Sequence, residues 1–144
     1  MLAAENPLNA GPLIFPALEC LHITGFTLML GTIAIVDFRL LGLVMTSRPA
    51  AALVKDMSTW TILGLGLVFL SGPLMFATDP DMYYLNRAFQ LKMALLVGGL
   101  LFHYLVRNKA IRNGISTSSG VALACVSIAL WFGVIAGAIF IGFV

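Results

Sequence analysis

The chain has 144 residues, of which 60% are hydrophobic and only 10% are charged, and its mean hydropathy is +1.03. A soluble domain of this size carries roughly a quarter charged residues, so this composition excludes a water-solvated surface and indicates that lipid surrounds most of the chain. The chain's eight basic and six acidic residues are too few for the clustered basic face that a nucleic-acid-binding protein needs.

Several apolar stretches are long enough to cross a bilayer as helices, because a hydrocarbon core of ~30 Å needs about 20 residues. The first is opened by Pro12 and Pro16, which are tolerated at a helix start. The sequence therefore predicts an all-α, integral membrane four-helix bundle that forms a single membrane domain over residues 1–144. The expected helices span residues 13–43, 59–77, 87–106 and 120–144.

The segment before the first helix, Met1 to Pro16, has no basic residue and contains Glu5. A cleaved signal peptide has a positively charged beginning, so this segment does not fit one. The first helix is therefore expected to be retained.

The three connections between the expected helices alternate in charge, and this alternation predicts how the chain is oriented. The first and third connections are basic, whereas the second is acidic and aromatic. In short loops Lys and Arg mark the cytoplasmic side, so both basic connections are expected in the cytoplasm and both termini on the outer, periplasmic side. The residues that set this orientation are Arg48, Lys55, Arg107, Lys109 and Arg112 against Asp79 and Asp81.

Ionisable side chains inside a membrane are costly, so each is a candidate functional residue. Helical spacing groups them, because the 11 residues from Lys92 to His103 leave them only about 20° apart on a helix. Glu19 and His22 are three residues apart and also share a face. Two polar layers are expected: an outer layer of Glu19, His22 and Lys92, and an inner layer of Asp37, Arg39, His103 and Arg107.

A purely structural role would explain the same residues. Glu19 and Lys92 would then form an ion pair between the first and third helices. Asp37 and Arg39 would form a pair near the interface that extends toward the headgroups. Each histidine would hydrogen-bond a neighbouring helix.

The two histidines are expected at different depths in the membrane. His22 precedes Arg39 by 17 residues, or about 25 Å along a helix, whereas His103 lies only ~6 Å from Arg107 at the inner boundary. Their separation of roughly 15–20 Å excludes one haem shared by both within a protomer.

Imidazole is the usual axial ligand of haem in four-helix bundles, so His22 and His103 are each predicted to bind a separate haem b. Gly99, one turn before His103, and Gly25, after His22, would leave room for a flat macrocycle. The second axial ligand is left open among methionines, solvent and a histidine of another subunit. Basic residues near the two layers would neutralise the propionates: Lys92 and Arg87 outside, Arg39 and Arg107 inside.

A copper site would use the outer layer differently, since thiolate and thioether ligands suit Cu(I). No Met-x-x-Met or Cys-x-x-Cys motif groups such ligands, so this signal is weaker. The cysteines are expected near opposite membrane faces, too far apart for a disulfide within one protomer. The candidate copper ligands beside His22 are Cys20, Met29, Met75 and Met93, and the second cysteine is Cys125.

The last helix contains a stripe of small residues, Ala129, Gly133 and Gly137, at four-residue spacing. Such a stripe lets helix backbones approach closely. It is expected to serve packing inside the bundle ahead of contact between copies of the chain.

Four motifs carry a resemblance: Glu19-x-x-His22, the run from Val36 to Gly42, Phe89-x-x-Lys92 and Phe102-His103. Together they resemble a family of small bacterial four-helix membrane proteins of unknown function. The chain is also distantly similar to the membrane domain of CopD-type copper-resistance proteins and to cytochrome b-like bundles. The resemblance covers nearly the whole chain and implies a bacterial inner membrane, with these polar residues forming the working site.

The leading functional prediction is a b-type haem protein of the inner membrane that carries or buffers electrons, with quinol or a redox protein as its partner. The alternatives are a copper-handling membrane protein and a cofactor-free scaffold or accessory subunit. Membrane lipid is the expected surrounding, nucleic acid is not expected as a partner, and a homo-oligomer is left open.

Overall fold

The computed structural model describes residues 6–144, and the regular structure in that range is entirely helical, which confirms the predicted all-α fold. Glu5, used above in the argument about a signal peptide, lies outside the described residues. The elements in chain order are η2 (Pro7–Asn9), α1 (Ile14–Leu40), α2 (Ala50–Thr78), α3 (Pro80–Tyr84), α4 (Arg87–Leu101), the π-helix η3 (Phe102–Arg107), α5 (Asn108–Asn113) and α6 (Thr117–Phe140).

Four helical spans are long and apolar enough to cross a membrane: α1, α2, the continuous helix α4–η3–α5, and α6. The chain therefore fits a multi-pass membrane protein. The two largest differences from the expected boundaries are that α2 begins at Ala50 and that the third span continues to Asn113, whereas the other boundaries differ by at most four residues. The charged residues that interrupt hydropathy there, such as Lys55 and Arg112, lie exposed on the helix surface and do not end the helix.

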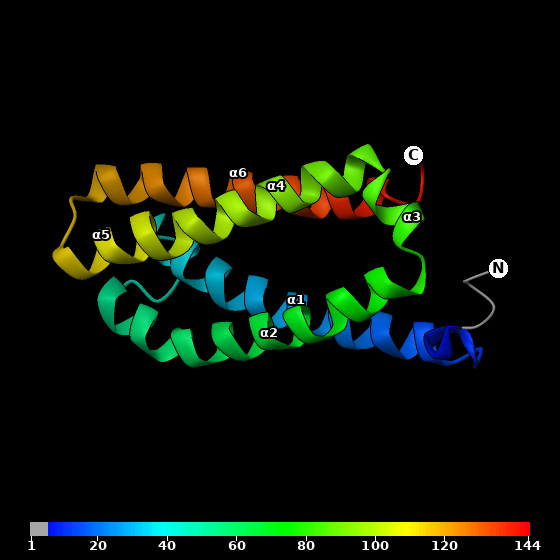
Figure 1. Cartoon of the computed structure of the whole chain (residues 1–144). Helices are drawn as coiled ribbons and strands as arrows, with labels where there is room; N and C mark the ends of the chain where they lie inside the picture. Colours follow the sequence, from blue (N-terminus) through cyan, green and yellow to red (C-terminus); the bar gives the residue numbers. More distant parts are fainter. Residues whose placement is uncertain (1–5) are drawn as a thin grey trace.

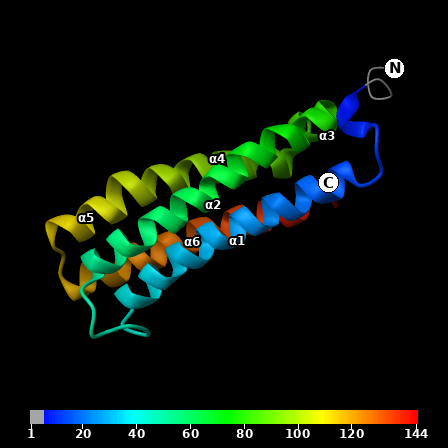
Figure 2. The same cartoon turned by 90° about the horizontal axis from the view of Figure 1, so that it is seen from below.

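The four spans form two hairpins that lie side by side (Figures 1 and 2). α1 packs along α2, α4 packs along α6, and α1 also contacts α6. α2 and α4 diverge toward the end that carries both termini, whereas α5 meets α2 at the opposite end (Figure 1). We call these the terminal end and the basic end, the latter because it holds Arg39, Arg48, Lys55, Arg107, Lys109 and Arg112.

Asn86 fixes the start of α4 at the terminal end. Its side-chain oxygen accepts hydrogen bonds from the backbone N–H groups of Ala88 and Phe89, which have no partner within the helix. Its amide nitrogen donates to the carbonyl of Ile141 at 3.0 Å. The start of α4 is thereby tied to the end of α6.

Two clusters of buried apolar residues fill the bundle at different heights. The cluster near the basic end contains Val36, Leu40, Leu53, Val54, Ile111 and Ala124. The second, which we call the central cluster, contains Met29, Ile33, Leu96, Trp131 and Val134. The central cluster joins α1, α4 and α6. It therefore separates the polar groups on its terminal-end side from those on its basic-end side.

The small-residue stripe of α6 faces α4. A Cβ atom added at Gly133 would lie 2.8 Å from Leu95 Cδ1, and one at Gly137 would lie 2.9 Å from Lys92 Cβ. At these two positions the prediction that the stripe serves packing inside the bundle is confirmed.

α1 and α2 approach each other closely at Gly25 and Gly64. A Cβ at Gly64 would lie 2.6 Å from both the Gly25 carbonyl oxygen and the Met29 backbone nitrogen. One at Gly25 would lie 2.5 Å from Leu67 Cβ. Glycine is therefore required at both positions for the two backbones to come this close.

We expect Gly64→Ala to destabilise the protein by roughly 1–3 kcal/mol, because the added methyl group must push α1 and α2 apart. Gly66→Ala is the matched control, since a Cβ there meets nothing within 4 Å and alanine favours the helix. Thermal unfolding of both variants in detergent measures the difference. Equal midpoints for the two variants would contradict this packing.

Candidate functional site: two buried polar clusters

The first polar cluster, here the basic-end cluster, is built around an ion pair between helices far apart in the sequence. Arg107 Nη1 lies 2.8 Å from Asp37 Oδ1, and each residue is only 1% exposed. The Ser127 hydroxyl donates to Asp37 Oδ2 at 2.7 Å. Arg107 Nη1 also lies 3.4 Å from the carbonyl of Ile33. This network joins α1, η3 and α6.

The π-helical turn brings further polar groups to this cluster. The backbone N–H of Asn108 bonds the carbonyl of His103, five residues back, so the two residues lie over one another on the helix. Arg107 Nε donates to Asn108 Oδ1 at 3.3 Å, and arginine has only donors, so this contact fixes which side of the amide is oxygen. The Asn108 nitrogen is thereby directed at His103 Nε2, 3.3 Å away.

The same contacts fix the tautomer of His103. Because the Asn108 amide donates to Nε2, the lone pair of Nε2 is used and the ring proton lies on Nδ1. Within residues 6–144, Nδ1 is buried without a hydrogen-bond partner, as is Trp131 Nε1 in the central cluster. A buried donor without a partner costs about 1–3 kcal/mol.

The second polar cluster, here the terminal-end cluster, consists of His22, Ser71 and Lys92. His22 Nδ1 lies 2.9 Å from the Ser71 hydroxyl, and that hydroxyl donates its proton to the carbonyl of Leu67 at 2.6 Å. A hydroxyl has one proton, so His22 Nδ1 must be the donor in the shared bond. In the neutral ring His22 Nε2 therefore keeps its lone pair, which neither Ser71 nor the neighbouring backbone carbonyl of Val68, itself an acceptor, can use.

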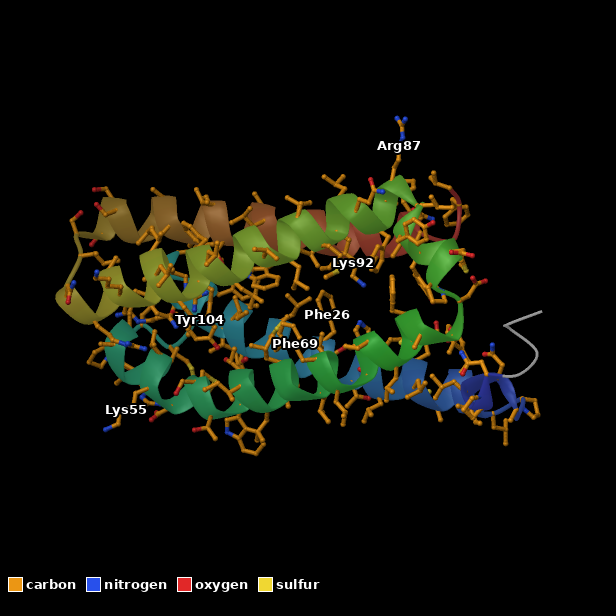
Figure 3. The ribbon with its side chains drawn as sticks, viewed as in Figure 1. Phe26, Lys55, Phe69, Arg87, Lys92 and Tyr104 are labelled. Atoms are coloured by element: carbon orange, nitrogen blue, oxygen red, sulfur yellow. The ribbon has the colours of Figure 1, made fainter. Side chains whose placement is uncertain are left out.

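Gly72 and Lys92 complete the surroundings of His22. A Cβ at Gly72 would lie 3.4 Å from His22 Cε1, so the imidazole ring occupies space that a side chain would restrict. Lys92 is half-buried and close enough to His22 for their charges to interact. Its side chain extends into the space between the two hairpins, as does Phe26 (Figure 3).

The predicted ion pair between Glu19 and Lys92 is not formed. Among residues 6–144 the ion pairs are Arg48–Asp56 and Asp37–Arg107, and Glu19 is exposed. Glu19 instead lies near Tyr83 of α3, where burial, helped by the carboxylates of Glu19 and Asp79, raises the pKa of the phenol. The reason is the divergence of the hairpins, which takes α4 away from α1 at this end.

The inner layer also differs from the expected one at Arg39. Asp37 pairs with Arg107, whereas Arg39 Nε donates to the carbonyl of Arg48 in the loop after α1, at 2.7 Å. Asp37 and Arg39 are two residues apart, about 200° around a helix, so they point to opposite sides. The predicted Asp37–Arg39 pair is therefore wrong, and Arg39 is not part of the basic-end cluster.

At both glycines expected to leave room for a macrocycle, other parts of the protein occupy that space. Gly99 lies against the ring of Trp131, whose Cη2 would be 3.5 Å from an added Cβ. Gly25 is in contact with α2, as described above. The residue that does make room beside a histidine is Gly72, which the sequence reasoning did not single out.

The two clusters lie at different depths, as the helix rise predicted. Asp37 is 15 residues after His22 on α1, or about 22 Å along the axis. His103 belongs to the level of Asp37 through Arg107 and Asn108. The central cluster lies between the two levels and provides an apolar layer.

The ligands proposed for copper are dispersed. Over residues 6–144 no three His, Cys, Asp or Glu side chains group as a metal site would require. Met29 is fully buried in the central cluster, and Cys20 and Cys125 are free and exposed. Met75 and Met93 lie on the helices beside the terminal-end cluster.

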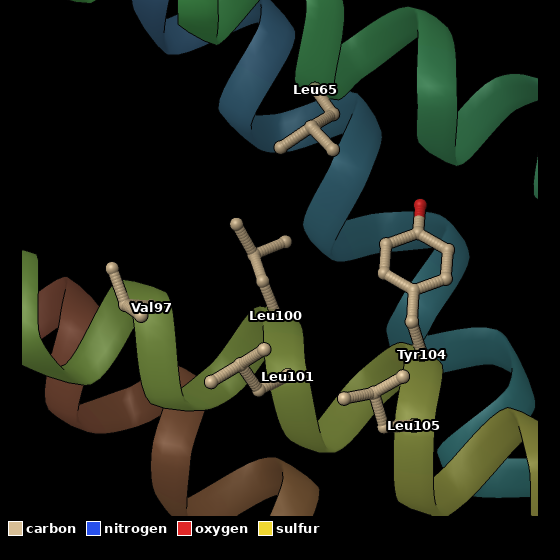
Figure 4. A pocket seen from close by; sticks show the side chains of 6 residues that line it. All are labelled: Leu65, Val97, Leu100, Leu101, Tyr104 and Leu105. Carbon is tan, nitrogen blue, oxygen red and sulfur yellow. The ribbon is translucent and has the colours of Figure 1, made fainter.

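A groove of about 350 Å³ runs between α2 and the helix α4–η3. Apolar side chains line it, and the only polar atom in view is the Tyr104 hydroxyl, which points toward α2 (Figure 4). A surface of this kind suits the acyl chains of the surrounding lipid. The lining residues are Leu65, Val97, Leu100, Leu101, Tyr104 and Leu105.

Comparison with known families shows which family the chain belongs to. The profile of a family described as a family of unknown function (DUF6644) matches residues 13–144, and the chain belongs to this family. Searches of curated proteins and of solved structures each gave no match. The comparisons therefore show no similarity to CopD-type or cytochrome b membrane domains, so the two polar clusters are the basis for inferring what the chain does.

Proposed function

We propose that this chain is a b-type haem protein that holds one haem through His22 and carries electrons within the membrane. The observation that supports this proposal most strongly is the free Nε2 of His22. The other ring nitrogen, Nδ1, donates to the hydroxyl of Ser71 on α2. In metal sites, a hydrogen bond of this kind orients the histidine ring that binds the metal. Nothing else in the described chain uses that lone pair.

The surroundings of His22 fit a haem in two further respects. Lys92 is a cation in a membrane span that forms no ion pair within residues 6–144, and a haem propionate would provide an acidic partner. α2 and α4 diverge at this end, and the Lys92 side chain lies between the two hairpins (Figure 3). Bound haem would supply one-electron redox chemistry, with quinol or a redox protein as the exchange partner.

His103 fits a ligand role less well than His22 does. Its Nε2 accepts from Asn108, so a second haem there would require that hydrogen bond to be given up. The ligand role of His103 stays a prediction, and the proposal is limited to the site at His22. No observation favours the copper or the scaffold alternative over the haem site.

The proposal includes a location and an orientation. The resemblance to small bacterial membrane proteins and the two basic connections support an inner membrane with the basic end in the cytoplasm and the termini in the periplasm. After the two ion pairs are counted, Arg39, Lys55, Lys109 and Arg112 remain uncompensated at that end.

Reporter fusions test the orientation. A fusion at residue 47, between α1 and α2, should be fluorescent with green fluorescent protein and inactive with alkaline phosphatase, because the enzyme folds only outside the cytoplasm. A fusion at the C-terminus should show the opposite pattern. Phosphatase activity at residue 47 would exclude this orientation.

The absorption spectrum tests the haem. We expect protein purified from cells supplied with a haem precursor to show a Soret band that shifts to longer wavelength on reduction. A colourless protein that stays colourless after incubation with hemin in detergent would overturn the proposal.

A further inference from the structure

We infer that the basic end carries a binding site for the phosphate group of an anionic phospholipid, formed where α2 and α5 meet. A hollow of about 320 Å³ lies there, lined by Lys55 and Ser58 of α2 and Arg112 of α5, with Ala51 and Val54 as its apolar wall. It lies apart from the His22 region and does not depend on the haem proposal.

The charges around the hollow are not balanced by the protein. Lys55 of α2 and Arg112 of α5 are 57 residues apart in the sequence, and neither has a carboxylate within 4.0 Å among the described residues. The neighbouring Asp56 is already paired with Arg48. Because two cations line one hollow and neither has a carboxylate partner in the described chain, the site is suited to a negatively charged group.

The position of the hollow indicates which kind of molecule would supply that anion. α2 begins here and α5 ends here, at the ends of two apolar spans, so in a membrane this hollow would lie near the lipid headgroups. Basic pockets between membrane helices bind anionic headgroups. Ala51 and Val54 provide an apolar wall that would contact the glycerol and the first methylenes of the lipid.

The side chains can reach such a group without disturbing the fold. Lys55 is exposed and extends away from the bundle (Figure 3), and its flexible stem allows the ammonium to follow a headgroup. Arg112 is also exposed. α2 starts at this site without a side-chain cap, so its first N–H groups add a favourable field for an anion.

Native mass spectrometry of the full chain tests the inference, with phosphatidylglycerol and phosphatidylcholine offered in equal amounts. The parent should retain phosphatidylglycerol preferentially, and Lys55→Gln/Arg112→Gln should bind it about twentyfold more weakly. The control Arg87→Gln/Lys109→Gln removes the same charge from two residues that do not line the hollow and should bind almost as the parent does. Circular dichroism confirms that each variant is folded.

Three results would decide against the site or identify the source of the phosphate. Equal weakening in both double variants would overturn it, because diffuse charge would then explain the binding. No preference of the parent for phosphatidylglycerol, together with no binding of inorganic phosphate, would also overturn it. Occupancy by inorganic phosphate at millimolar concentration, lost in Lys55→Gln/Arg112→Gln alone, would support the phosphate site and identify free phosphate as its ligand.

Discussion

Replacing Arg107 by Ala is expected to lower the free energy of unfolding by roughly 3–5 kcal/mol, because Asp37 would be left as a buried charge without its partner. Arg107 and Asp37 are each 1% exposed, so water cannot replace the lost guanidinium. Ser127 alone would remain as a donor to the carboxylate. Unfolding in detergent, followed by circular dichroism, measures the loss.

Arg48→Ala is the matched control for this prediction. It breaks the pair with Asp56, whose side chains are 44% and 45% exposed, and should cost less than about 1 kcal/mol. Replacing both members of the buried pair, as Asp37→Leu/Arg107→Leu, should recover much of the loss, since no unpaired charge remains. Equal stability of Arg107→Ala and Arg48→Ala would show that the buried pair is unimportant.

His22→Ala is expected to abolish haem binding, because Nε2 of His22 is the ligand atom in the proposed site. His103→Ala is the informative comparison, since its Nε2 already accepts from Asn108 and it should leave the haem content unchanged. Haem content and the spectrum of each purified variant give the answer. Full haem in His22→Ala would remove the basis of the proposed site.

Ser71 provides a finer test of the same site. Ser71→Ala removes the acceptor of the Nδ1 proton without touching the ligand atom. Loss of such a partner typically weakens metal affinity 10–100-fold, so weaker haem retention with an otherwise similar spectrum is expected. Ser58→Ala, which removes a hydroxyl from the same helix near the basic end, should have no such effect.

Much of the fold could be predicted from the sequence, because lipid demands apolar helices of a set length. The helix rise was also sufficient to put His22 and His103 at different depths. The start of α2 could not be predicted from hydropathy, because Lys55 and Asp56 lie exposed on a helix whose opposite face buries Leu53 and Val54.

The pairing of side chains could be predicted only in part. Asp37, His103 and Arg107 were expected in one layer and are joined there. Asn108 was expected in a loop, because nothing in the sequence marks the π-helical turn that brings it inward. Ser71 and Ser127 were missed, although a hydroxyl in an otherwise apolar span is a signal that could have identified both.

The prediction of a Glu19–Lys92 ion pair was wrong for a different reason. Helical spacing shows which residues share a face of one helix, but it does not show how far apart two helices lie. The divergence of the hairpins at the terminal end follows from their packing, including the glycine contacts that hold α1 against α2 and α6 against α4. Lys92 is consequently left without an acid, which is part of the reason for proposing an anionic cofactor beside it.

The ratio of haem to protein tests the central claim most directly. The pyridine haemochrome assay on the purified parent chain, with protein quantified by amino-acid analysis, gives this ratio without assumptions about the spectrum. A single haem per chain, lost in His22→Ala and retained in His103→Ala, is the result that the proposed site predicts. A chain that binds no haem after reconstitution, or one that keeps its haem without His22, would contradict it.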